Sequence, residues 1–159
     1  MTRHYDVKTF RSSDSLGYLL KLSHSLMHDA AAAAFAGHDV SFAQWLVLMK
    51  LREGAALTAS DLCRVMRHDN GALTRLLDQL EARGYVARER SHEDRRVVEL
   101  QLTAAGRDKV AELVPLVVHR LNSSLAGFSK AEFTEFTRLL NKLITDLAAS
   151  EQAATDAGS

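Results

Sequence analysis

The feature that most constrains the fold is a change of hydrophobic period in the middle of the chain. The segment ALTRLLDQLEARG, ending at Gly84, repeats leucine at i, i+3, i+4 and i+7, which is the spacing of one apolar helix face. Directly after it, YVARER and VVELQL alternate apolar and polar side chains, as a half-buried strand does. The two runs flank the polar segment SHEDRR. The sequence therefore predicts a helix followed by a β-hairpin.

Helical patterns occupy most of the remaining chain, which contains one proline. Residues 13–36 and 41–54 each carry helical spacing that ends at a glycine, and Ser41 with Gln44 predicts a capping box. Thr58 is a predicted cap for a short helix whose Leu62, Val65 and Met66 point inward. After the hairpin, Thr103 is expected to cap a fifth helix. A second capping box, Ser129 with Glu132, opens a last helix that the apolar pattern carries to Ala149.

Composition narrows the class of protein. With 159 residues and 47% apolar composition, the chain has room for one domain with a core. The longest apolar run is too short to cross a bilayer, and the first residues lack the apolar block of a signal peptide, so we expect a cytoplasmic protein without membrane contact. The single cysteine, Cys63, fits a reducing compartment. A formal net charge of zero argues against coating of nucleic acid by bulk electrostatics and leaves a local basic site possible.

The order of helix, short helix, turn, helix and hairpin predicts a winged helix-turn-helix, a mostly α fold with a small two- or three-stranded antiparallel sheet. In that fold the second helix of the pair presents its amino-terminal residues to base edges in the major groove. Arginine, asparagine and threonine can read bases there, and a glycine permits close approach. The leucine pattern leaves these residues on the outer face: Asn70, Gly71, Thr74, Arg75 and Asp78.

Arginine is concentrated in this region. Eight of the fourteen arginines lie between residues 64 and 96, where no lysine occurs, and arginine suits phosphate forks and narrow minor grooves. Six acidic residues share the window, so charge alone is equally consistent with a solvated, ion-paired surface. The arginines lie on the predicted hairpin and on the outer face of the predicted helix, and this placement favours a DNA-binding site.

The combination LEARGYVARERSHEDRR and LTAAGR resembles the signature of the MarR family of transcriptional regulators. The resemblance implies a dimeric winged-helix repressor or activator on a pseudo-palindromic operator. It also implies dimerisation helices in residues 1–40 and 104–149 and a DNA-binding lobe in residues 41–103. The apolar stripe of the last helix independently requires a cover, and a second copy is the expected one. Residues 150–159 lack large apolar side chains and are expected to be disordered.

The resemblance also implies roles for the hairpin tip. Arg96 would enter the minor groove, Asp94 would orient it and Arg95 would meet the backbone, or the two arginines would exchange these roles. His68, in the turn before the helix, and His92, in the hairpin tip, are candidate phosphate contacts, and the alternative is that both are simply exposed. The predicted DNA-binding set is Arg67, His68, Asn70, Gly71, Thr74, Arg75, Asp94, Arg95 and Arg96.

Many MarR-family proteins release DNA when a small aromatic or phenolic compound fills a pocket, and the resemblance places such a pocket near Leu22, Ser25, Phe42 and Trp45. The alternative for Trp45 is plain core. His24 and His28 have the spacing of metal ligands but lack a third ligand, so no metal or other cofactor is predicted.

Alternative functions remain open at this point. Cys63 is expected to pack inward, and a redox-sensing regulator of the same fold is the alternative. A winged-helix module for protein contacts is another. No serine, cysteine or carboxylate constellation has a convincing partner set, so we predict that the protein is not an enzyme.

Overall fold

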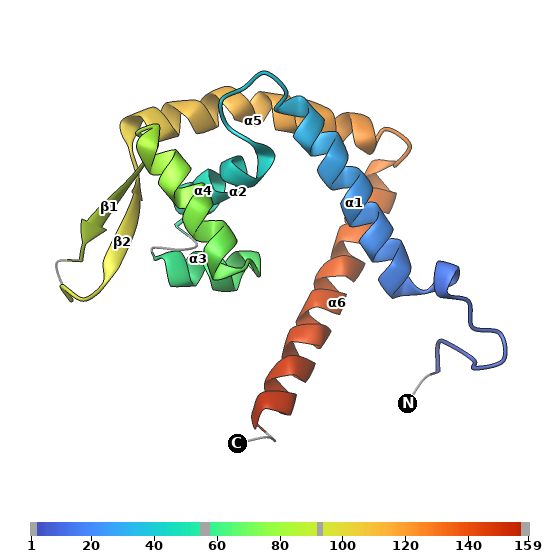
Figure 1. Cartoon of the computed structure of the whole chain (residues 1–159). Coiled ribbons are helices and arrows are strands. Elements are labelled where there is room, and N and C mark those ends of the chain that lie inside the picture. Colours follow the sequence, from blue (N-terminus) through green and yellow to red (C-terminus); the bar gives the residue numbers. More distant parts are fainter. Residues whose placement is uncertain (1–2, 55–57, 92–93, 157–159) are drawn as a thin grey trace. The chain divides into compact units, whose positions relative to one another are not determined.

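The computed structural model describes residues 3–54, 58–91 and 94–156 (Figure 1). The chain forms two compact units, residues 1–121 and 122–159. Within the described residues, no helix is both long enough and apolar enough to pass through a bilayer. The elements, in chain order, are a 3-10 turn at Ser12–Asp14, α1 (Leu16–Ala34), α2 (Phe42–Arg52), α3 (Ala59–Met66), α4 (Asn70–Ala82), β1 (Val86–Arg90), β2 (Val98–Leu102), α5 (Ala104–Ser124) and α6 (Lys130–Asp156).

The helix caps follow the sequence pattern. The Ser41 hydroxyl accepts the backbone N–H of Gln44, whose side chain in turn accepts the backbone N–H of Ser41. Thr58 and Asp61 form the same reciprocal pair at the start of α3. Ser129 and Glu132 repeat it before α6. Each pair satisfies donors that a helix start leaves open, so the predicted helix starts are confirmed.

The hairpin is a two-stranded antiparallel sheet, with Val86 opposite Leu102 and Arg90 opposite Val98. Figure 1 shows it extending beside α4, on the side away from α1. Leu100 is buried, whereas Val98 is 45% exposed, because only the base of the hairpin reaches the core. The expected burial of alternate β2 side chains therefore holds only near the base. The predicted mostly α, winged helix-turn-helix fold is confirmed.

The core of the first unit lies where α2, α3, α4, the hairpin base and α5 meet. Three of the α4 leucines are buried in it, and Leu62 supplies the α3 side. Val65, predicted to point inward, is 43% exposed, because eight-residue α3 is covered along only one narrow stripe. The fully buried large side chains are Val40, Val47, Leu48, Leu62, Leu73, Leu77, Leu80, Val110 and Leu113.

The start of α5 packs directly against the backbone just before β1 and against the end of β2. Thr103, the predicted cap, accepts the backbone N–H of Gly106 and donates its hydroxyl to the Gly84 carbonyl. A Cβ at Gly106 would overlap the carbonyl oxygen of Tyr85 and lie 2.9 Å from the Leu102 side chain. Glycine is therefore the residue that permits this contact.

The second unit consists of the end of α5 and α6. Its apolar side chains are poorly covered: the rings of Phe128 and Phe136 contact each other, yet both are exposed. The prediction of a disordered tail is wrong for residues 150–156, which continue α6 to Asp156. Alanine, glutamate and glutamine in this segment favour a helix even without burial. Residues 157–159 lie outside the described residues.

Candidate nucleic-acid interface

A tight turn sets the start of α4. Arg67 ends α3 in the left-handed region, with φ of 49°, and the Asp69 carboxylate accepts the backbone N–H groups of Gly71 and Ala72. Asp69 therefore caps the helix, a role that the sequence reading did not assign. Its signal was available, since aspartate is a favoured residue directly before a helix. Arg67 and His68, both exposed, lie in this turn.

The predicted recognition face is solvent-exposed. Asn70, Gly71, Thr74 and Arg75 are all exposed on the first two turns of α4, opposite the buried leucines. The Thr74 hydroxyl donates to the Asn70 carbonyl at 2.8 Å, which orients the threonine methyl relative to the helix. The Asn70 side-chain oxygen accepts the Cys63 thiol at 2.8 Å. A polar, unburied strip at a helix start is the geometry that major-groove reading requires.

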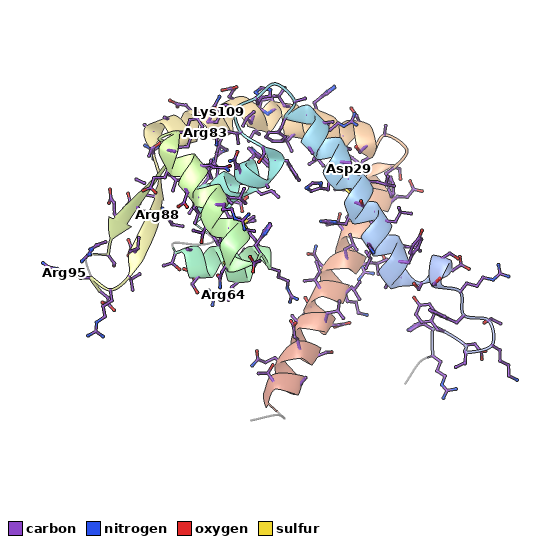
Figure 2. The ribbon with its side chains drawn as sticks, viewed as in Figure 1. Asp29, Arg64, Arg83, Arg88, Arg95 and Lys109 are labelled. Atoms are coloured by element: carbon purple, nitrogen blue, oxygen red, sulfur yellow. The ribbon has the colours of Figure 1, made fainter. Side chains whose placement is uncertain are left out.

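The described part of the hairpin tip, which we call the wing tip (Ser91 and residues 94–97), contains a short turn. The Asp94 carboxylate accepts the backbone N–H of Arg96 at 2.9 Å, and the Asp94 carbonyl accepts that of Val97, also at 2.9 Å. Arg95 and Arg96 are exposed, and Figure 2 shows Arg95 projecting from the tip. The observed bond holds the backbone of Arg96, whereas the resemblance implied that Asp94 orients its side chain. His92 and Glu93 lie outside the described residues.

Some arginines of the region are held in ion pairs. Arg88 on β1 pairs with Asp78 and Glu81 of α4, at 2.7 and 2.6 Å, and Figure 2 shows it between the hairpin and α4. Arg64 pairs with Asp61 within α3. These acids therefore neutralise particular arginines away from the wing tip. The ion pairs of Arg88 could not be predicted from the sequence, because the alternation of YVARER does not show which helix the strand faces.

A polar network joins the loop before α2 and the residue before β1 to α5. The Tyr85 hydroxyl donates to Asp39 at 2.6 Å, and the Lys109 ammonium lies 3.3 Å from the same carboxylate. The hydrogen bond from Tyr85, assisted by Lys109, lowers the pKa of Asp39 below its usual value. The same bond raises the pKa of Tyr85. The loop before α2, the start of β1 and α5 are thereby tied together.

Two cavities that share His24, His28 and Leu46 lie between α1 and α2. Of the residues predicted for an effector pocket, Phe42 lines one of them. Trp45 is 8% exposed and stacks on Phe42, while Leu22 and Ser25 are exposed and line neither cavity. The first cavity, of about 320 Å³, is lined by His24, Met27, His28, Ala31, Phe42, Leu46 and Leu121. The second, of about 420 Å³, is lined by His24, His28, Ala43, Leu46, Lys50, Val65, Met66 and His68.

The remaining candidate residues are His24, His28 and Cys63. No cluster of three or more histidine, cysteine, aspartate or glutamate side chains suited to a metal occurs in the described part of the chain. The rings of His24 and His28 lie 6.1 Å apart, and His28 also contacts Phe42. Cys63 is half-buried, with its thiol directed at Asn70.

Comparison with known proteins identifies relatives. The model of the MarR family matches residues 40–98, from the loop before α2 to the start of β2. The chain is 32% identical over 110 residues to the transcriptional repressor MprA of Escherichia coli, covering 67% of this chain and 61% of that protein. It is 34% identical over 107 residues to the multiple antibiotic resistance protein MarR of Escherichia coli, covering 67% of this chain and 74% of that protein. The chain thus spans about three fifths of the length of MprA.

Solved structures share the fold. A variant of E. coli MarR in complex with operator DNA has a TM-score of 0.73 and 29% identity, covering 80% of this chain and 92% of that one. BpsR of Bordetella bronchiseptica, whose DNA binding is regulated by 6-hydroxynicotinic acid, has a TM-score of 0.76 and 27% identity. The match covers 84% of this chain and 96% of that one.

Proposed function

Because this chain belongs to the MarR family of transcriptional regulators, we propose that it binds a pseudo-palindromic DNA operator as a homodimer and represses transcription from it. The observation that carries the proposal is the exposed strip Asn70, Gly71, Thr74 and Arg75 at the start of α4. In the described part of the first unit these residues are exposed and none of them belongs to the buried core. Operator DNA bound by the MarR structure and the repressor role of MprA support the same reading.

The wing supplies the second contact of this proposal. Arg95 and Arg96 are both exposed at the end of a hairpin that projects beyond the core. An arginine at such a tip can enter a narrow minor groove beside the major groove that α4 reads. We assign Arg96 to the minor groove and Arg95, with Arg67 and His68, to phosphate contacts.

Uncovered apolar surface supports the homodimer. Large apolar side chains of α1 and α6 are exposed far beyond what a monomer usually leaves to water. A second copy would bury both sets symmetrically and would present two copies of α4 to two half-sites about one helical turn apart. The exposed side chains are Leu16, Tyr18, Leu19, Leu22, Leu26 and Met27 of α1, and Phe133, Phe136, Leu139, Ile144 and Leu147 of α6.

Selection of an operator from random DNA by the purified protein tests the proposal. We expect a two-fold symmetric site and an affinity that falls steeply with salt. Arg75→Ala and Arg96→Ala should each weaken binding at least about fivefold, since a good arginine contact contributes about 1–3 kcal/mol of discrimination. Arg83→Ala is the matched control, because Arg83 caps the opposite end of α4. Sequence-blind or salt-insensitive binding would exclude this function.

We further propose that a small aromatic or phenolic acid releases the DNA by filling the paired cavities. Their walls combine aromatic and aliphatic side chains with Lys50, His24 and His28, which suits an aromatic ring bearing an acidic group. The second cavity touches Met66 and His68, at the end of α3 and in the turn before α4. An occupant would therefore shift the helix pair relative to α1. The regulation of BpsR by 6-hydroxynicotinic acid supports this ligand class.

A panel of aromatic carboxylates tests the effector. A true effector should raise the melting temperature of the free protein and lower its affinity for the operator at the same concentrations. Lys50→Met should abolish both responses and leave operator binding intact. Lys130→Met, at the start of α6, is the matched control. Stabilisation that does not change operator affinity would count against regulation through these cavities.

Redox control of the same DNA binding is a second candidate, favoured by one contact. The Cys63 thiol donates to the side chain of Asn70, the first residue of α4. Peroxide would oxidise this thiol to a sulfenic acid, with one oxygen atom added to the sulfur and water released, and the added oxygen would push against the recognition face. Peroxide should then abolish operator binding of the wild type and spare Cys63→Ser. Equal sensitivity of both proteins would exclude the candidate.

A further inference from the structure

We propose that Arg88 is a positioning residue that locks the wing to α4, so that the two DNA-contacting elements keep a fixed separation. The inference rests on the proposed function, because it assigns to Arg88 a part in the same DNA binding without any contact to DNA.

The contact is two-pronged. Arg88 Nη2 lies 2.7 Å from Asp78 Oδ1, and Nη1 lies 2.6 Å from Glu81 Oε2. Asp78 and Glu81 are three residues apart and so share one face of α4, one turn from each other. The planar guanidinium fork contacts both at once, which fixes direction as well as distance. A lysine could offer only a single nitrogen.

The arginine is partly sheltered, which strengthens the lock. Its side chain is 31% exposed, and its pKa is raised above the usual value, chiefly by the hydrogen bond to Asp78 and then by the charge of Glu81. An ion pair at this depth is screened less by salt than a fully exposed one. The strand and the helix are therefore held together under the salt conditions in which DNA binding is measured.

Its place along the hairpin explains why the lock matters. Arg88 lies opposite Leu100, which is buried, and the next pair on that face, Arg90 and Val98, is exposed. Among the described residues of the hairpin beyond this pair, Ser91 is buried but no large apolar side chain is. The tip lies roughly 10–15 Å further out, at about 3.4 Å per strand residue. At that distance a tilt of about 10° would move the tip arginines by roughly 2–3 Å, more than a hydrogen bond tolerates.

A distance measurement without DNA tests the lock itself. In a Cys63→Ser background, spin labels at Ala82→Cys on α4 and Arg95→Cys on the wing tip report the separation of the two elements. Arg88→Gln should broaden the distance distribution, while Arg90→Gln, two residues along the same strand, should leave it narrow. The triple change Arg88→Glu, Asp78→Arg and Glu81→Gln restores an attraction of opposite sense and should narrow it again. An unchanged distribution in Arg88→Gln would overturn the proposal.

DNA binding provides the second test. On the selected operator, Arg88→Gln should lower affinity about tenfold, equivalent to about 1.4 kcal/mol, and Arg88→Lys by less. In an Arg96→Ala background the same change should cost less than about twofold, since the residue acts through the tip. If the losses of operator affinity caused by Arg88→Gln and Arg96→Ala are additive, while the melting temperatures stay unchanged, the positioning role is overturned. If the wild type selects no operator, the proposed function fails while the distance result still decides the lock.

Discussion

The carboxylate of Asp94 accepts the backbone N–H of Arg96 at 2.9 Å and so closes the turn that carries the tip arginines. An asparagine at residue 94 keeps a side-chain oxygen in that place, whereas an alanine removes it. We therefore expect Asp94→Ala to lower operator affinity about five- to tenfold, as the loss of a hydrogen bond of about 1 kcal/mol would. Asp94→Asn should retain most of the affinity. Titration of labelled operator with each variant measures both effects.

The pair of variants separates two mechanisms. If the negative charge of Asp94 oriented the Arg96 side chain, asparagine and alanine would weaken binding alike. Equal losses of operator affinity in Asp94→Ala and Asp94→Asn would therefore exclude a role through the hydrogen bond to the Arg96 backbone. The thermal stability of both variants should stay close to that of the wild type, because the turn is exposed.

Gly106 is predicted to be intolerant of a methyl group. Gly106→Ala would press against the Tyr85 carbonyl and the Leu102 side chain, so we expect a loss of about 1–3 kcal/mol in the free energy of unfolding. Gly127→Ala is the matched control, since no atom lies within 4 Å of a Cβ there and its φ is not in the left-handed region. That change should be neutral or stabilising by up to about 1 kcal/mol. Urea denaturation measures both, and an equal effect at the two sites would contradict the prediction.

Stability should depend on pH through Asp39. Its pKa is lowered in the folded protein, so its contribution is fully present above the unfolded value of about pH 4 and is lost as the pH falls through the folded pKa. Asp39→Asn should therefore be less stable than the wild type at neutral pH, and the difference should shrink below about pH 4. Urea denaturation at a series of pH values measures it. A difference that persists unchanged to pH 2 would exclude this origin.

The sequence predicted those parts of the fold that depend on local chemistry. Ser41 with Gln44 and Ser129 with Glu132 were recognisable because a capping box acts within one helical turn. Exposure of Asn70 and Arg75 followed from the leucine period in the same way. Each of these features requires only neighbours in the chain.

Contacts between distant segments were not predictable in this way. The pairing of Arg88 with Asp78 depends on how the hairpin lies against α4, which the charges of residues 64–96 do not reveal. The exposure of Val65 depends on what covers α3. Residues 150–156 continue α6 although they lack large apolar side chains, so the absence of an apolar stripe does not predict where this helix ends. In each case the observed structure depends on more than the pattern of neighbouring residues in the sequence.

The last prediction concerns the proposed dimer. Phe136, on α6, is 44% exposed in the single chain, and a partner helix would bury its ring. Phe136→Asp would place a charge in that apolar contact, so we expect dissociation to monomers at micromolar concentration and loss of operator binding, since half-sites would no longer be held together. Thr137→Asp adds the same charge at the adjacent polar residue and should remain dimeric. Sedimentation velocity measures the assembly, and a Phe136→Asp protein that stays dimeric would rule out this face of α6 as the interface.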